Sequence, residues 1–180
     1  MIGVGERFPE FSLQGVSGYG EFGDHDADHD FIQQESWSLE DWSVIYFYPK
    51  DFTFICPTEI VGMDILREET EEVFGISPDN EHCKWNWKTS DEHDPLYGVR
   101  HRLLADCGNV LADTLGIVDP QENVPYRATY IVDPEGIIQH VSINALDTGR
   151  NAEEILRTLQ ALKAGGLTGC QWQPGEDFVA

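Results

Sequence analysis

The chain has 180 residues, of which 41% are hydrophobic and 24% are charged. This composition is typical of one globular domain and too hydrophobic for a disordered protein. The net charge is −22, from 33 acidic and 11 basic residues. It argues against nucleic acids and anionic membranes as partners, because proteins bind both through lysine and arginine.

Residues 1–7 do not have the pattern of a signal peptide, since no basic start leads into an apolar run. No stretch of the sequence comes near the roughly 20 consecutive apolar residues that a membrane-spanning helix needs. We therefore expect a cytoplasmic protein whose thiols stay reduced.

Residues 1–36 carry eight acidic residues and one basic residue, and we expect them to form a less regular end of the domain. Within them, residues 24–30 alternate between aspartate and histidine, a pattern that could bind a divalent cation. The alternative is a solvated acidic loop, because a flexible loop presets no coordination geometry.

The first regular element that we expect is a strand at residues 43–48, where a continuous β-branched and aromatic run is typical of a strand buried on both faces. Pro49 ends it, and residues 57–74 predict a helix with Pro57 in its first turn. Shorter segments then predict a strand at 73–77, a helix at 81–88, a strand at 102–105 and a helix at 110–115.

Two strands at residues 127–132 and 137–143 complete the sheet that we expect. Residues 133–136 join them with proline second and glycine fourth, as in a type I turn, so the pair is predicted to be antiparallel. Strands that alternate with helices and end in one hairpin predict an α/β fold with a central mixed β-sheet flanked by helices.

The clearest helix is predicted at residues 152–163. Its leucine and isoleucine residues form one stripe, Asn151 and Glu154 suit a capping box at its start, and a Gly-Gly pair ends it. The residues after it show no periodicity. We therefore expect one domain at residues 1–165 and a C-terminal tail at residues 166–180.

The cysteines are spread along the chain without a Cys-x-x-Cys pair, which argues against a thioredoxin-type dithiol and a zinc ribbon. Cys56 has the clearest chemical setting, because it follows a buried strand and a short loop and stands where a helix begins. Amide groups and the dipole at a helix N-terminus favour a thiolate over a thiol. Thr53 can turn its hydroxyl toward the same pocket, and Pro49 packs over the loop. The alternative is a buried cysteine that acts as a small hydrophobic residue.

Residues 49–59 read Pro-Lys-Asp-Phe-Thr-Phe-Ile-Cys-Pro-Thr-Glu, and this segment resembles the peroxidatic motif of typical two-cysteine peroxiredoxins of the AhpC type, in the AhpC/TSA family. The similarity extends to residues 6–11, to Trp87 after Ser77-Pro78-Asp79, to residues 127–134 and to residues 149–152. The resemblance implies a thioredoxin-like fold and a thiol-dependent peroxidase for hydrogen peroxide and organic hydroperoxides. It implies no metal and no organic cofactor, because the sulfur carries the redox chemistry.

The resemblance also implies roles for single residues. Cys56 is the thiolate that attacks the peroxide and becomes a sulfenic acid, while Thr53 and Arg127 hold the peroxide. Without the resemblance, Arg127 would be interpreted as a surface ion pair. Glu59 could orient an arginine, or could simply be a favourable acid in the first turn of a helix. Trp87 supports the site.

Cys170 lies beyond the last helix, where typical two-cysteine members carry their resolving cysteine. The resemblance implies an intersubunit disulfide between Cys56 and Cys170, re-reduced by a dithiol protein that is thioredoxin-like or AhpD/AhpF-like. The register differs from the usual one, because Thr168 occupies the expected position. Cys83 is therefore kept as the alternative resolving residue, and Cys107, at a strand end, is expected to be passive.

A homodimer that assembles into a decamer-type ring is also implied. The net charge of −22 and the presence of only four lysines predict a halophilic setting, since salt screens repulsion among surface acids. Two other functions stay open: a ring-forming holdase chaperone, and a dithiol–disulfide oxidoreductase of the same fold, against which the missing Cys-x-x-Cys argues.

Overall fold

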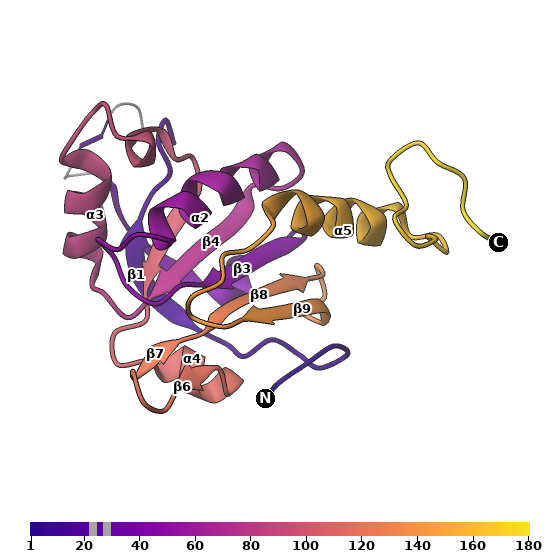
Figure 1. Ribbon diagram of the computed structural model, residues 1–180, viewed down its shortest axis with the longest axis horizontal. Coiled ribbons are helices and arrows are strands. Elements are labelled where there is room, and N and C mark those ends of the chain that lie inside the picture. The colour runs from indigo at the N-terminus through magenta and orange to yellow at the C-terminus, as the bar shows by residue number, and fades with distance from the viewer. Residues whose placement is uncertain (22–24, 27–29) are drawn as a thin grey trace.

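The computed structural model describes residues 1–21, 25–26 and 30–180 (Figure 1). In this part of the chain, seven strands form one sheet in the order β2-β1-β5-β4-β3-β8-β9. Their bounds are β1 Ser12–Val16, β2 Phe31–Glu35, β3 Ser43–Phe47, β4 Glu72–Ser77, β5 Arg102–Ala105, β8 Arg127–Val132 and β9 Ile138–Asn144. A short ribbon pairs β6 Val118–Asp119 with β7 Val124–Pro125.

The sheet is mixed, as the sequence predicts. Strands β3, β4 and β5 run parallel, while β8 pairs antiparallel with both β3 and β9, and β1 pairs antiparallel with β5. All five residues of β3 are buried at the centre of the sheet. Parallel strands end at the same edge, so the loops after β3 and β4 meet there and form the surroundings of Cys56 and Cys83.

The helices are α2 Cys56–Met63, α3 Glu81–Thr89, α4 Val110–Leu115 and α5 Ala152–Ala164, with short 3-10 helices at Ser36–Ser38, Asp64–Glu68 and Pro95–Gly98. Figure 1 shows α2 and α5 over one face of the sheet and α4 over the other.

Each face of the sheet has its own hydrophobic cluster, because side chains alternate along a strand. On the α4 face, Ile45 and Phe47 of β3 pack with Leu111 and Leu115 of that helix. On the α2 face, Tyr46 packs in one cluster with residues of α2 and α5, among them Cys56, Ile60, Met63, Ile155 and Leu159. The period of β3 therefore places Tyr46 on the same side of the sheet as Cys56.

Several predicted elements are confirmed to within one residue: α3, α4, α5, β5, β8 and β9. In the turn between β8 and β9 the Gly136 amide donates to the Asp133 carbonyl at 2.9 Å, and the strands are antiparallel. At the start of α5 the Asn151 side chain accepts from the Glu154 amide, and Gly165 ends the helix in the left-handed region with φ of 71°.

The predicted helix at residues 57–74 is wrong in its second half. The α-helix ends at Met63 and continues only as the 3-10 helix Asp64–Glu68, before β4 begins at Glu72. Asp64 is the C-cap residue of α2, and its carboxylate ties this end of the helix to another segment by accepting the backbone amides of Arg100 and His101, at 2.8 and 3.2 Å. This contact spans 36 residues and leaves no trace in local periodicity.

The prediction of an irregular N-terminal end is also wrong, because β1 and β2 lie there and pair from Ser12 with Glu35 to Val16 with Phe31. Both strands are short, and β2 contains two glutamines on the edge of the sheet, so the apolar pattern was weak. None of the helices in the described ranges has the length and apolar composition needed to cross a bilayer.

Of the acidic and histidine-containing segment 24–30, residues 24 and 27–29 lie outside the described residues. His25 and Asp30 pair with each other at 3.0 Å, and both side chains are buried. The second ring nitrogen of His25 lies 2.9 Å from the Tyr97 carbonyl oxygen. A solvated loop is therefore wrong for these two residues, whose polar atoms serve to dock the segment.

Candidate active site

Cys56 is the first residue of α2, at the end of the loop that follows β3. Its side chain is 1% exposed and packs in the hydrophobic cluster under α2. The loop is held in an unusual shape, since Phe52 has φ of 53° and its ring stacks on Trp87 with the centroids 5.2 Å apart. Trp87, on α3, therefore supports the loop that leads into Cys56.

Arg127 reaches the sulfur from β8. Its Nη1 donates to the Cys56 sulfur at 3.5 Å, and its Nε donates to the Leu146 carbonyl at 2.8 Å. Burial lowers the pKa of Arg127, but the Cys56 sulfur and the Glu59 carboxylate outweigh burial and shift it upward. A fixed positive charge thus lies beside the sulfur, in a buried ion pair rather than in the surface pair that was the alternative.

Glu59, one turn of α2 after Cys56, accepts from two arginines. Its Oε2 lies 2.5 Å from Arg127 Nη1 and 3.0 Å from Arg150 Nη1, and its Oε1 accepts the Arg150 amide at 3.1 Å. All three side chains are buried. With two guanidinium groups against one carboxylate, this cluster is positive where it faces the sulfur, and Glu59 orients arginines as one of the two sequence interpretations proposed.

Arg150 was not among the site residues predicted from the sequence. It donates from Nε to the Thr129 hydroxyl at 2.9 Å and from Nη2 to the carbonyls of Phe47 and Ala128. Burial lowers the pKa of Arg150, with Glu59 opposing this shift. The available signal was the segment at residues 149–152, whose similarity to the family includes Arg150.

A pocket of about 430 Å³ opens beside the sulfur, lined by Pro49, Thr53, Phe54, Cys56, Arg127 and neighbouring residues. Pro49 is buried, and Phe54 is 95% exposed at the rim. The Thr53 hydroxyl donates to the Lys50 carbonyl at 2.9 Å, so its oxygen keeps lone pairs that can accept from another donor. The structure therefore brings Pro49, Thr53, Cys56, Glu59 and Arg127 together.

Cys170 lies elsewhere. It is exposed in the tail and lines a separate pocket, formed between the tail and α5, that includes Arg157. The tail is anchored there, because Trp172 is buried and its carbonyl accepts from Arg157 at 3.2 Å. In Figure 1 the tail extends away from the start of α2, so one chain does not bring Cys170 to Cys56.

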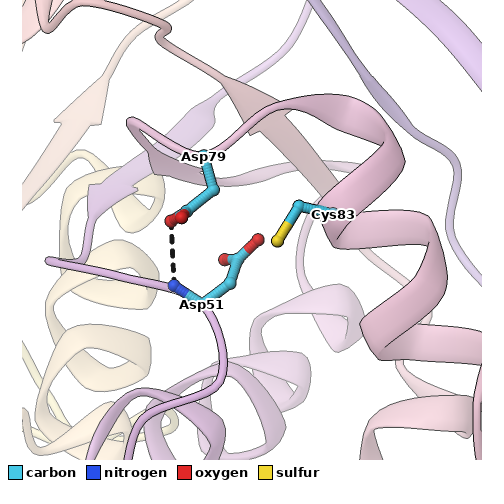
Figure 2. A group of neighbouring side chains, drawn as sticks. All are labelled: Asp51, Asp79 and Cys83. Atoms are coloured by element: carbon cyan, nitrogen blue, oxygen red, sulfur yellow. Dashed lines mark hydrogen bonds between the residues drawn. The ribbon is translucent and has the colours of Figure 1, made fainter.

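Cys83 is half-buried in the first turn of α3, beside Asp51 and Asp79 (Figure 2). Burial and then the charges of Asp51 and Asp79 raise the pKa of the Cys83 thiol to about 11. Ligand atoms of these three residues lie within 4.8 Å of one another, but the buried Lys84 ammonium lies 3.4 Å from Asp51 and already supplies the cation. Cys107 is exposed after β5.

Comparisons with known proteins find relatives that match almost the whole chain. The model of the AhpC/TSA family matches residues 4–141. The chain is 37% identical to alkyl hydroperoxide reductase C of Mycolicibacterium smegmatis, over 99% of this chain and 94% of that protein.

Among solved structures, the fold is similar to AhpC of Mycobacterium tuberculosis, with a TM-score of 0.83, 33% identity and coverage of 96% of this chain and 99% of that one. It is also similar to the reduced two-cysteine peroxiredoxin of Plasmodium vivax, with a TM-score of 0.85, 28% identity and coverage of 98% and 92%.

Proposed function

The chain belongs to the AhpC/TSA family and is a thiol-dependent peroxidase with a thioredoxin-like fold, and we propose that Cys56 is the residue that peroxide oxidises. The observation that carries this assignment is the buried sulfur at the start of α2 with Arg127 Nη1 3.5 Å away. Positive charge at that distance stabilises the thiolate and also the negative charge that develops on the peroxide.

The proposed reaction starts when the Cys56 thiolate attacks the terminal oxygen of a hydroperoxide. A sulfur–oxygen bond forms and the O–O bond breaks, so the sulfur becomes a sulfenic acid, and the leaving alkoxide or hydroxide takes a proton and departs as alcohol or water. Arg127 donates to the oxygen that gains charge, a contribution of roughly 10²–10³ in rate for one fixed donor. Thr53 accepts the O–H of the bound hydroperoxide, and Glu59 and Arg150 keep Arg127 in place.

Hydrogen peroxide and organic hydroperoxides are the proposed substrates. Beside the polar groups, the pocket is lined by apolar side chains, among them Pro49, Phe54, Ile55, Val124 and Leu146. Such a lining supports binding of an alkyl group while Arg127 and Thr53 hold the two oxygens.

The sulfenic acid is proposed to react with Cys170 of a partner subunit, giving an intersubunit disulfide and water. Because Cys56 is 1% exposed, the start of α2 must unwind for this step. Cys83 is the weaker candidate, since a thiol with a pKa of about 11 is rarely ionised at neutral pH. A dithiol protein, thioredoxin-like or AhpD/AhpF-like, then reduces the disulfide.

The proposed working form is a homodimer, assembled into a decamer-type ring, in a cytoplasm of high salt content. Residues 1–165 act as the catalytic domain, and residues 166–180 act as the tail that delivers Cys170. The division is supported by the tail, which contains no helix or strand among the described residues, and the high-salt setting is supported by the acidic composition.

Non-reducing electrophoresis after peroxide treatment tests the proposal. A covalent dimer should form in the parent, in Cys83→Ser and in Cys107→Ser, and should be absent in Cys56→Ser and Cys170→Ser. A dimer that persists in Cys170→Ser and disappears in Cys83→Ser would make Cys83 the resolving residue. A dimer that persists in Cys56→Ser would remove Cys56 from its proposed role.

A further inference from the structure

Three polar side chains lie behind α2, at the end opposite Cys56, and two of them, Tyr46 and His101, are buried. The Tyr46 hydroxyl lies 2.7 Å from His101 Nε2, and His101 Nδ1 lies 2.9 Å from Asp64 Oδ1. Tyr46 and His101 are almost completely shielded from solvent, and Asp64 is the residue that caps α2. The three come from β3, from the loop before β5 and from the end of α2.

The positions of the protons in these hydrogen bonds can be assigned by starting from Asp64. The Asp64 carboxylate can only accept, so Nδ1 of His101 carries a proton. Burial lowers the pKa of His101, which keeps the ring neutral, and its Nε2 therefore accepts from the Tyr46 hydroxyl. The tyrosine is thus neutral and donates to the histidine, and the neutral histidine donates to the ionised aspartate.

The sheet is shaped to admit the Tyr46 hydroxyl. Gly75 lies opposite Tyr46 in the parallel pairing of β3 with β4, and a Cβ on Gly75 would lie 2.5 Å from that hydroxyl. Any larger residue would displace the tyrosine. A glycine inside a central strand weakens the strand, so its presence here is explained by the space that the Tyr46–His101 contact needs.

Tyr46 is linked to both ends of α2, by hydrogen bonds through His101 at one end and by a cation–π contact with Arg150 at the other. At the end of α2, Asp64 also accepts from the amides of Arg100 and His101, at 2.8 and 3.2 Å. At its start, the Arg150 guanidinium that pairs with Glu59 lies over the Tyr46 ring, 5.0 Å from its centroid. Tyr46 therefore contacts both His101, which binds the end of α2, and Arg150, which binds its start.

We propose that Tyr46, His101 and Asp64 are positioning residues that hold the C-terminal end of α2 and oppose the unwinding that exposes oxidised Cys56. This inference rests on the proposed function, in which the Cys56 sulfenic acid must leave its buried position to meet Cys170. The anchor then sets the balance between disulfide formation and further oxidation to sulfinic acid, because only the unwound form can be resolved.

Tyr46→Phe is the test variant, because it keeps the ring under Arg150 and removes the hydroxyl. Loss of one buried hydrogen bond corresponds to about a fivefold change in an equilibrium. The ratio of the rate of disulfide formation to the rate of Cys56 oxidation should therefore rise about fivefold, measured by rapid quenching and mass spectrometry. The fraction of Cys56 driven to sulfinic acid by excess peroxide should fall.

Tyr130→Phe is the matched control. Tyr130 is also fully buried, in the neighbouring strand β8, but within the described residues its hydroxyl has no hydrogen-bond partner. The rate ratio in Tyr130→Phe should equal that of the parent. Hydrogen exchange adds a readout of the site itself: α2 amides should exchange faster in Tyr46→Phe, while α5 amides should not.

Faster exchange in α2 together with an unchanged rate ratio would overturn the inference and leave the proposed function intact. An equal increase in exchange in α2 and α5 would also overturn it, since Tyr46 would then stabilise the whole core. A parent that oxidises Cys56 but forms no disulfide would overturn both the inference and the proposed resolving step, whereas a parent in which Cys56 is not oxidised would overturn the proposed function as a whole.

Discussion

Cys56 and Cys83 lie near the same edge of the sheet, each in the first turn of a helix and each beside a largely buried cluster of charges. The described cluster at Cys56 has one carboxylate, Glu59, and two guanidinium groups, Arg127 and Arg150. The described cluster at Cys83 has two carboxylates, Asp51 and Asp79, and the ammonium group of Lys84. The two sites use similar residue types with the opposite balance of charge.

The difference in balance decides what each sulfur can do. At Cys56 an arginine donates directly to the sulfur, so negative charge there is stabilised. At Cys83 the neighbouring aspartates add to burial and raise the pKa of the thiol to about 11. The start of a helix is therefore not sufficient to lower the pKa of a cysteine, since at Cys83 burial and two nearby aspartates raise it.

The cluster at Cys83 serves the structure instead. Lys84 donates to the Ser77 hydroxyl at 2.5 Å and to the Tyr48 hydroxyl at 3.2 Å, and Asp51 accepts from the same tyrosine at 2.8 Å. These contacts join the loop after β3 to the end of β4 and the start of α3. They fix the loop that carries Thr53 toward Cys56.

The largest expected effect separates the two cysteines. Cys56→Ser should lower peroxide turnover with dithiothreitol as reductant by at least about 1,000-fold, because a serine hydroxyl is not ionised at neutral pH and does not attack peroxide. Cys83→Ser should stay within threefold of the parent. Comparable losses in both variants would show that the charge balance does not select the reactive sulfur.

The second effect concerns Arg127, the cation beside the sulfur that we propose to be reactive. Arg127→Gln should lower the rate of Cys56 oxidation by roughly 10²–10³, the contribution of one fixed donor to developing charge. Arg7→Gln is the control, because Arg7 is exposed at the other end of β8, near Gly136. Stopped-flow tryptophan fluorescence can measure both. A loss below tenfold in Arg127→Gln would assign the stabilisation to another group.

The third effect is the pH dependence of Cys83. With a pKa of about 11 against an ordinary 9.0, its thiolate fraction at pH 8 is about 100-fold lower than that of an unperturbed thiol. Alkylation of Cys83 by iodoacetamide should therefore rise about tenfold per pH unit until pH 11, as followed by peptide mass spectrometry. A plateau near pH 9 would contradict the raised pKa.

Asp79→Asn sharpens the same comparison. It removes one of the two negative charges near Cys83 and keeps an oxygen that can accept from the Asp51 amide, now 2.8 Å from Asp79. Alkylation of Cys83 at pH 8 should become roughly three- to tenfold faster, in the range of one partly screened charge pair. Glu135→Gln, an exposed acid in the β8–β9 turn, should leave it unchanged.

Salt is expected to have the smallest effect on the difference between Cys56 and Cys83. The net charge of −22 acts on both sites alike, and at ~1 M salt the Debye length is ~3 Å. The melting temperature should rise between 0.1 and 1 M potassium chloride, while Cys56 stays the cysteine that peroxide oxidises first. A flat melting temperature would leave the acidity unexplained by salt adaptation.

The sequence predicted the parts of the site that are contiguous or that start a regular element. Pro49, Thr53, Cys56 and Glu59 stand within eleven residues, and Arg127 begins a strand with a strong apolar pattern. The expected mixed sheet followed from the same patterns. The strands and helix starts follow from local periodicity, which a sequence displays directly, whereas the roles of Thr53 and Arg127 follow from the resemblance of their segments to the AhpC/TSA family.

The buried charge clusters could not be predicted in this way. The contact between Glu59 and Arg150 joins residues 91 positions apart, and Lys84 reads as a solvated residue on a helix although it is fully buried. A charged residue becomes a core residue only when folding supplies its partners. The missed hairpin of β1 and β2 has a similar cause, because its edge strand is half polar.

Identification of the first cysteine to be oxidised is the most direct test of the central claim. The reduced protein would receive one equivalent of peroxide in the presence of a sulfenic-acid trap, and the remaining thiols would then be alkylated in denaturant and located by peptide mass spectrometry. The trapped sulfenic acid, or a disulfide made from it, should lie at Cys56, with Cys83 recovered as an alkylated thiol. Trapping at Cys83 while Cys56 is recovered as a thiol would contradict the account.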